Sequence, residues 1–339
     1  MSLADGTGPG THDVLVGHER AMSAFEEATR SGKLHHGWLI TGPEGIGKAT
    51  LAYRMARYLI AGAGGRILDH TLSDATGRKI AGEAHPNLLV LERAMDATGK
   101  RRKTELTVDV IRKLNAFFGT TAGEGGWRVA IVDSANEMNA SAANALLKNL
   151  EEPPDQTILI LVSHRPGRLL PTIRSRCRVL PLKPLASEQV QDILAQLPDL
   201  MASPEERVAA AGLAAGAPGR AVALLEAAGL DLVTTLKALL AQPTPDWAAI
   251  HALASSFQSR EAESQFQIMI STWRDETAAA VRHAVSSGQI ARANELANYS
   301  ESFNARLDEA LGLNLDKRQF ILDAFDRWHA ITSPAGALG

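Results

Sequence analysis

The sequence predicts an α/β domain with a parallel sheet, followed by a small helical domain and then a second helical domain. A glycine-rich phosphate-binding motif lies near the N-terminus, between an apolar run and a helix-like stretch. Short apolar runs alternate with helical patterns as far as residue 182, which is typical of βαβ units. Beyond Pro184 the helical patterns continue and strand signals nearly vanish. We expect disorder over 1–12 and domains over 13–182, 183–242 and 246–333.

Composition indicates a globular protein of more than one domain. The chain has 339 residues, of which 45% are hydrophobic and 22% charged, and its net charge is −3. This balance does not mark the whole chain as a nucleic-acid binder. No apolar stretch of membrane length and no signal-peptide pattern occurs, so we expect a cytoplasmic protein. Cys177 is the only cysteine, which excludes an intrachain disulfide and a cysteine-based zinc site.

The strands and one helix can be placed from local patterns. Asn139 is a plausible N-cap for a helix whose apolar side chains repeat at i, i+3, i+4 and i+7, and Pro153-Pro154 end that helix. Ser187 is a plausible cap for the first helix beyond the sheet, and Gln242-Pro243-Thr244-Pro245 is typical of a linker. We expect strands over Trp38–Thr41, Leu88–Glu92, Arg128–Asp133, Thr157–Ser163 and Arg178–Leu182.

The phosphate-binding motif lacks one of its usual residues. In such a loop, glycines let backbone N–H groups approach phosphate and the lysine contacts the β- and γ-phosphates. Ala49 occupies the position where Ser or Thr would hold Mg²⁺. Thr50 follows by one residue, about 100° around the helix, so it is a poor substitute. The motif indicates nucleotide-binding ancestry and argues against efficient hydrolysis, and its candidate ligands are Gly42, Gly45, Gly47 and Lys48.

Two later strands end in residues that suit the same site. Asp133 follows an apolar strand, where an aspartate orients Mg²⁺ or its water shell, although a turn or cap role is equally compatible. Ser134 stands where a glutamate often polarises the attacking water, so the general base is missing. Ser163 ends the next strand, where it would contact a γ-phosphate or cap the following turn.

Two basic clusters and a histidine pair complete the candidates. Arg174, Arg176 and Arg178 precede the last strand, and an arginine there would act on a neighbouring subunit's phosphate or lie in a solvated turn. Residues 100–103 are basic and suit a solvated loop or a nucleic-acid contact. His35 and His36 precede the first strand, and their i, i+1 spacing predicts opposite faces, which disfavours a metal site.

The motif Asn144-Ala145-Leu146-Leu147-Lys148-Asn149-Leu150-Glu151-Glu152-Pro153-Pro154, followed by Ser175-Arg176-Cys177, resembles the AAA+ clamp-loader family of DNA replication. The resemblance runs from about Val14 into the C-terminal helices, and it is specific through residue 182. The changes at Ala49 and Ser134 are similar to those of a family member that does not hydrolyse ATP. The resemblance implies an AAA+ domain, a helical lid domain and a collar domain that holds five subunits together.

The resemblance also implies roles by position. Arg176 would be a finger acting in trans, while Lys48, Asp133, Ser163 and Arg220 would match the P-loop lysine, the Walker B aspartate, sensor 1 and sensor 2. With the loop glycines and Thr50 they would form a degenerate site that requires no cofactor and binds ATP or ADP weakly at most. Implied partners are the ATPase (gamma/tau) and delta subunits and, within the complex, the sliding clamp and primer–template DNA, with no membrane.

One further departure concerns metal, and two other interpretations remain. Many relatives carry a four-cysteine zinc module between the P-loop and Walker B regions, whereas residues 61–86 contain no cysteine, so no zinc is expected. The retained Lys48 leaves nucleotide binding open. One alternative is an active ATPase subunit of the same family; the other is a standalone nucleic-acid-binding module, which the net charge of −3 disfavours. Nothing suggests polymerase chemistry.

Overall fold

The computed structural model describes residues 9–11, 13–95, 103, 105–119, 125–197, 200–258, 262–313 and 315–332. The predicted disorder at the N-terminus and three of the four basic residues at 100–103 therefore fall largely outside the described residues. The chain forms two compact units, Met1–Asp199 with Ala214–Arg220, and Leu200–Leu213 with Ala221–Gly339.

The described strands of the first unit form one parallel sheet, as predicted. They are β1 (Gly37–Thr41), β2 (Leu88–Leu91), β3 (Arg128–Val132), β4 (Thr157–Ser163) and β5 (Arg178–Pro181). Their order is β2-β3-β4-β1-β5, and every pairing is parallel. All carboxyl ends therefore lie at one edge of the sheet, where ligands bind in open α/β sheets.

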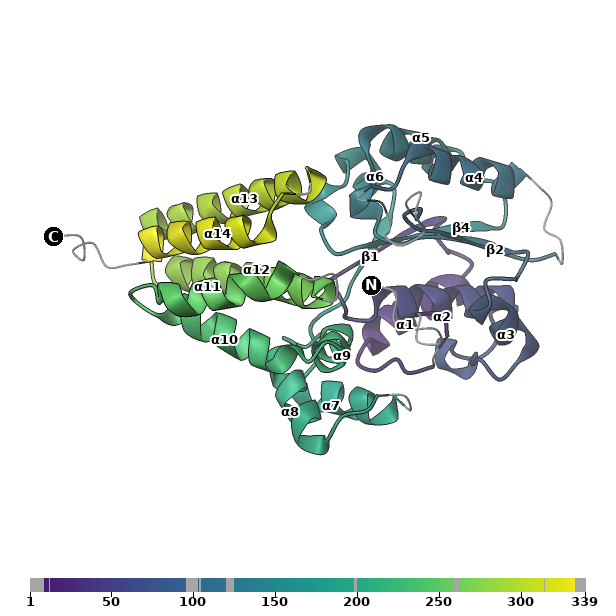
Figure 1. Cartoon of the computed structure of the whole chain (residues 1–339). Helices are drawn as coiled ribbons and strands as arrows, with labels where there is room; N and C mark the ends of the chain where they lie inside the picture. The colour runs from purple at the N-terminus through teal and green to yellow at the C-terminus, as the bar shows by residue number, and fades with distance from the viewer. Residues whose placement is uncertain are drawn as a thin grey trace. The chain divides into compact units, whose positions relative to one another are not determined.

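Helices cover both faces of this sheet (Figure 1). Along β1, Trp38 and Ile40 join one core and Leu39 joins the other, because successive side chains of a strand alternate between faces. In the first core Phe25 of α1 contacts Trp38 edge-on, with ring centroids 4.9 Å apart. The helices of the two faces are α1 (Glu19–Arg30) and α2 (Lys48–Ile60) on one, and α4 (Val108–Gly119) and α5 (Ala140–Glu151) on the other.

The helix caps test two sequence predictions. The Ala142 N–H donates to Asn139 Oδ1 at 2.9 Å, which confirms Asn139 as the N-cap of α5. The prediction for Ser187 is wrong, since Ser187 is the first residue of α7 (Ser187–Gln196) and Ala186 is its N-cap. There the Ala186 N–H donates to Gln189 Oε1 at 3.0 Å, so a glutamine in the first turn satisfies this end of the helix. The shorter helices of this unit are η1 (Ile67–Asp69), α3 (Ala75–Ala81), η2 (Ala135–Glu137), η3 (Pro166–Arg168) and α6 (Pro171–Ser175).

The second unit is helical in every described element. Its core is aromatic: Trp273 stacks on Phe303 at 5.5 Å and meets Phe325 edge-on at 4.5 Å. The Trp328 indole N–H donates to the Leu240 carbonyl at 2.9 Å, which ties the last helix to α10. Its elements are α8 (Pro204–Leu213), α10 (Gly229–Ala241), α11 (Trp247–Ser255), η4 (Ser256–Gln258), α12 (Glu263–Ser286), α13 (Ile290–Gly312) and α14 (Lys317–Thr332), while α9 (Pro218–Glu226) begins in the first unit.

No helix in the described part of the chain is both long and apolar enough to cross a membrane. The predicted linker 242–245 separates α10 from α11, while the three predicted domain boundaries stay predictions.

Candidate functional site

The phosphate-binding loop adopts a conformation that its glycines make possible. It leaves β1 at the carboxyl edge of the sheet and enters α2 at Lys48. Gly42, Gly45 and Gly47 have φ values of 147°, 76° and 99°, which side chains rarely adopt. A Cβ on Gly45 would lie 2.9 Å from the Arg220 nitrogen, and one on Gly42 would lie 2.7 Å from the Leu182 carbonyl oxygen. The loop therefore packs directly against backbone.

Lys48 is bonded to the loop itself. Its side chain is buried, with 6% of the residue exposed, and Nζ donates to the carbonyls of Gly42 at 2.9 Å and Pro43 at 2.5 Å. Burial lowers the Lys48 pKa to about 8, although the charges of Glu44 and Asp133 act in the opposite direction. The ammonium that would contact phosphate thus already has two acceptors.

The residue that usually binds Mg²⁺ in such loops is a serine or threonine, and here it has no hydroxyl group. Ala49 has none to offer, and Thr50 is buried in α2 with 6% of the residue exposed.

Asp133 lies where β3 ends, at the same edge of the sheet. Burial raises the pKa of Asp133 and nearby Glu92 raises it further, while the Ser134 backbone and Lys48 lower it. Ser134 has a φ of 57°, a left-handed conformation that is strained for a non-glycine residue. Asp133 therefore lies within electrostatic reach of Lys48, and the residue that follows it in the chain is a serine rather than a glutamate.

Ser163 is buried and hydrogen-bonded within the protein. It pairs with Thr41 in the β1–β4 register, next to the loop, and is fully buried. Its hydroxyl donates to Asn136 Oδ1 at 3.0 Å and accepts the Arg165 N–H at 3.2 Å. The sequence analysis did not predict this role of Asn136. The one available signal was its position three residues after Asp133.

The segment Ala214–Arg220 brings Arg220 to the loop. The Gly219 N–H donates to the Gly45 carbonyl at 2.8 Å, and the Leu185 N–H donates to the Gly216 carbonyl at 3.0 Å. These two bonds anchor the segment within the first unit. Lys48, Asp133, Ser163 and the backbone of Arg220 thus lie near the carboxyl end of β1, while their roles toward a nucleotide stay predictions.

Arg176 lies at the opposite end of the sheet. It precedes β5 by two residues, and a Cβ on Gly37, the first residue of β1, would lie 3.0 Å from its carbonyl oxygen. Its guanidinium forms an ion pair with Glu151 at 3.0 Å and donates from Nη1 to the Thr172 carbonyl at 3.1 Å. The Arg176 side chain is 38% exposed.

The other groups near this end have structural contacts. His35 and His36 stack at 4.4 Å, which corrects the prediction of opposite faces, because both residues precede β1 and its alternation does not reach them. The Arg178 guanidinium lies 5.1 Å from the Trp38 ring centroid. Burial raises the pKa of the half-buried Cys177 to about 12, which suits a packing role rather than a nucleophile.

Comparisons with known proteins identify the family of this chain. A family model described as "DNA polymerase III, delta subunit" matches residues 17–186. The DNA polymerase III subunit delta′ of Pseudomonas aeruginosa is 39% identical over 54% of this chain and 53% of that protein. The subunit delta′ of Escherichia coli is 31% identical over 87% of this chain and 84% of that protein. This chain belongs to the delta′ family of DNA polymerase III subunits.

The family model matches residues that lie within the first unit. The chain spans about half the length of the Pseudomonas delta′ subunit, whereas its match to the Escherichia coli delta′ subunit reaches into the helical second unit. A solved DNA polymerase III gamma subunit-related protein from Thermotoga maritima is 17% identical, with a TM-score of 0.40 over 91% of this chain and 99% of that one.

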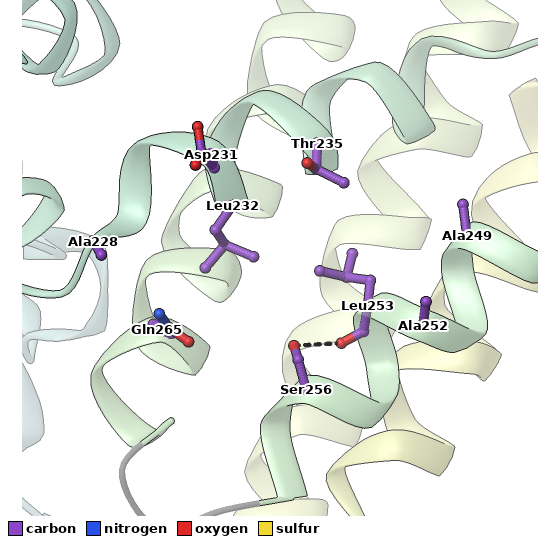
Figure 2. A pocket seen from close by; sticks show the side chains of 9 residues that line it. All are labelled: Ala228, Asp231, Leu232, Thr235, Ala249, Ala252, Leu253, Ser256 and Gln265. Carbon is purple, nitrogen blue, oxygen red and sulfur yellow. Dashed lines mark hydrogen bonds between the residues drawn. The ribbon is translucent and has the colours of Figure 1, made fainter.

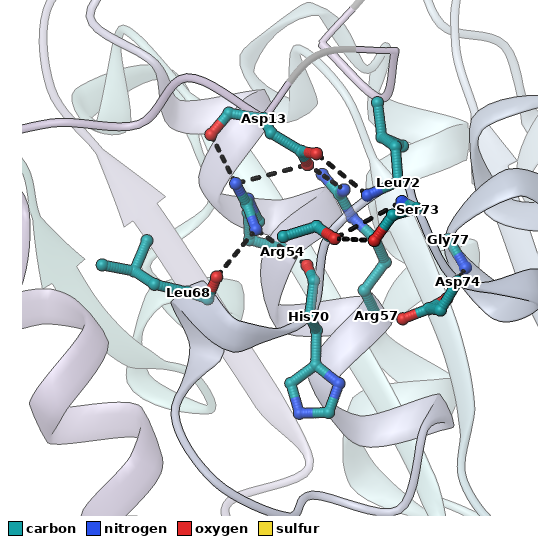
Figure 3. Close-up of polar contacts among 10 residues, drawn as sticks. Asp13, Arg54, Arg57, Leu68, His70, Leu72, Ser73, Asp74 and Gly77 are labelled. Atoms are coloured by element: carbon teal, nitrogen blue, oxygen red, sulfur yellow. Dashed lines mark hydrogen bonds and ion pairs between the residues drawn. The ribbon is translucent and has the colours of Figure 1, made fainter.

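In this delta′-family chain, two buried arginines hold the cysteine-free segment 61–86, Arg54 by hydrogen bonds to it and Arg57 through Asp13 (Figure 3). Arg54 and Arg57 of α2 are 2% and 1% exposed. Arg54 donates to the His70 carbonyl at 2.7 Å, and Arg57 Nη1 donates to Asp13 Oδ1 at 2.7 Å. Asp13 Oδ2 accepts the Leu72 N–H at 2.9 Å. Sequence reasoning missed this cluster, and no three potential metal ligands converge anywhere among the described residues.

The second unit carries a groove between α10, α11 and α12 (Figure 2). Its volume is about 450 Å³, and small and apolar side chains predominate in its lining. The charged residue in that lining is Asp231, and Gln265 uses its amide to donate to the Ala227 carbonyl at 3.0 Å. The groove brings together no group of residues with recognisable chemistry.

Proposed function

We propose that this delta′-family chain is a clamp-loader subunit that does not hydrolyse ATP itself and supplies Arg176 to ATP bound by an adjacent ATPase subunit. The observation that carries the proposal is the placement of Arg176 relative to the chain's own phosphate-binding loop. The loop follows the carboxyl end of β1, whereas Arg176 lies against its first residue, Gly37.

The length of β1 separates the two features. Five strand residues span about 16 Å, which is more than an arginine side chain can bridge. A guanidinium at this end of the sheet therefore suits a phosphate held by another subunit. Such a finger neutralises the charge that develops during phosphoryl transfer. With 38% of its side chain exposed, Arg176 is accessible for this contact.

The chain's own loop is poorly equipped for turnover. Ala49 and Ser134 remove a metal ligand and the general base. The Gly42 and Pro43 carbonyls already accept two of the three ammonium hydrogens of Lys48, which leaves one for a phosphate. We therefore propose that Lys48, Asp133, Ser163 and Arg220, with the loop glycines and Thr50, keep an inherited geometry that binds ATP or ADP weakly at most.

The partners we propose follow from family membership. They are the gamma/tau ATPase subunits and the delta subunit, with the sliding clamp and primer–template DNA engaged by the assembled loader in the cytoplasm. DNA contact is then a property of the assembly, in keeping with this chain's net charge of −3.

The test compares loaders reconstituted with wild-type chain, Arg176→Ala and Arg174→Ala, in the presence of clamp and primed DNA. Arg174 is the matched control because it is an exposed arginine on the same turn. We expect Arg176→Ala to lower the ATPase rate roughly 10³-fold without preventing assembly, and Arg174→Ala to have little effect.

Two results would overturn the proposal. Unchanged ATPase in the assembled Arg176→Ala loader would remove the finger assignment. ATP turnover by the isolated chain, abolished by Lys48→Ala, would instead favour the active ATPase subunit.

A further inference from the structure

The carboxylate of Glu151 is the nearest charged partner of the proposed finger. Glu151 is the last residue of α5, and its Oε1 lies 3.0 Å from Arg176 Nη2. On the other side of the guanidinium, Nη1 donates to the Thr172 carbonyl at 3.1 Å. The planar guanidinium is thus held at both terminal nitrogens, each of which carries a second hydrogen for another acceptor.

The stability that such a pair contributes is small. The side chains of Arg176 and Glu151 are 38% and 49% exposed, and exposed pairs of this kind contribute little to folding. Its main physical consequence is therefore orientation, because fixing a guanidinium restricts the several rotatable bonds of an arginine side chain.

The end of α5 that carries Glu151 is itself anchored. His36 Nε2 donates to the Leu150 carbonyl at 2.9 Å, which satisfies one of the carbonyls left open where the helix ends. Gly37 packs against the same corner, since a Cβ there would lie 2.9 Å from Leu150 Cδ2 and 3.0 Å from the Arg176 carbonyl oxygen. The histidine that sequence analysis left without a role thus braces the helix end against β1.

The partial charge at the C-terminal end of α5 also favours this position of the Arg176 guanidinium. The C-terminal end of a helix carries a partial negative charge, so α5 itself attracts a cation at Glu151. The ion pair and the helix end together favour one placement of the guanidinium before any neighbouring subunit arrives.

We infer that Glu151 is a positioning residue that holds Arg176 ready for the phosphate of a neighbouring subunit's nucleotide. This inference rests on the proposed function. In the proposed complex Glu151 does not contact the nucleotide and acts only through Arg176. Preordering an arginine in this way saves the entropy that would otherwise be lost when the transition state forms, so it affects kcat more than KM.

The experiment measures ATPase rate against ATP concentration for reconstituted loaders with clamp and primed DNA. The variants are Glu151→Gln, which keeps shape and removes charge, Glu151→Asp, which keeps charge, and Glu152→Gln as the matched control on the adjacent exposed residue. We expect kcat to fall about tenfold in Glu151→Gln with KM nearly unchanged. Glu151→Asp should recover part of the rate, and Glu152→Gln should match wild type.

A double mutant separates positioning from a structural effect. If Glu151 acts through Arg176, Glu151→Gln adds no further loss in an Arg176→Ala background. An additional loss in that background, or equal losses in Glu151→Gln and Glu152→Gln, would overturn the inference. So would a wild-type or faster rate in Glu151→Gln. If the Glu151 inference fails in this way but Arg176→Ala still lowers the ATPase rate, the proposed function of Arg176 is retained. If Arg176→Ala has a normal rate, both the proposed function and the inference about Glu151 are wrong.

Discussion

Neutralising Asp13 should loosen the segment that follows α2. In wild type its carboxylate lies 2.7 Å from Arg57 and 3.3 Å from Arg54, and it accepts the Leu72 N–H. Among the described residues, Nε and Nη2 of Arg57 have no acceptor, so Asp13 is the anion that compensates this buried cation. Breaking a fully buried pair costs about 3–5 kcal/mol. Because the Asp13 side chain is 35% exposed, we reduce this to roughly 2–3 kcal/mol for Asp13→Asn.

Hydrogen exchange measures this loss locally. Peptides covering Ile67–Asp69 and Ala75–Ala81 should exchange roughly 30- to 150-fold faster in Asp13→Asn than in wild type. The control is Glu27→Gln, which breaks an exposed pair with Arg30 and should cost less than about 0.5 kcal/mol. If Asp13→Asn exchanges no faster than this control, then the buried arginines do not depend on Asp13 and the reasoning is wrong.

The same carboxylate predicts a pH dependence with a definite sign. Burial alone would raise the pKa of Asp13, but the Leu72 N–H, Arg57 and Arg54 outweigh it and lower the pKa below 3.8. The folded state therefore binds this proton less readily than the unfolded state. The stabilisation is complete above about pH 5, one unit above the unfolded pKa, and is lost as the pH falls through the folded pKa. Urea titrations would measure the unfolding free energy of wild type and Asp13→Asn. The difference between the two proteins should be smaller near pH 3 than near pH 6.

Two further predictions test the loop and the single thiol. Gly45→Ala adds a clash with Arg220 at 2.9 Å to the strain of a positive φ, whereas Gly32→Ala adds only the strain, since nothing lies within 4 Å there. Gly45→Ala should therefore cost roughly 1–3 kcal/mol more and speed hydrogen exchange in 214–220, which a similar profile in both variants would contradict. Because burial raises the Cys177 pKa to about 12, iodoacetamide near pH 8 should label the native thiol roughly 10³-fold more slowly than the unfolded chain, as mass spectrometry would measure. Rapid native labelling would contradict this.

Patterns of short range were readable from the sequence. The strands and the Asn139 cap follow from short apolar runs, helical periodicity and the preference of asparagine for the N-cap. The parallel sheet then places Lys48, Asp133 and Ser163 at one edge, because the carboxyl ends of its strands coincide.

Contacts between distant polar residues were not readable in the same way. Asp13 and Arg57 are 44 positions apart, and Ser163 and Asn136 are 27 apart. No local sequence pattern predicts either pair, because the neighbouring residues do not show whether a polar side chain is buried or solvated. The pair of Glu151 with Arg176 escaped notice for the same reason, although both residues lie in motifs that the sequence made conspicuous.

The loop glycines have a structural reason to persist that does not depend on nucleotide. A side chain at Gly42 would meet the Leu182 carbonyl, and one at Gly45 would meet the backbone of Gly219 and Arg220. Lys48 likewise joins the carbonyls of Gly42 and Pro43. The motif therefore holds β1, α2 and the segment 214–220 together through contacts within the protein. If Arg176 acts as the finger that we propose, these contacts help to hold the strand that packs against it, because Gly37 of β1 lies against the Arg176 carbonyl.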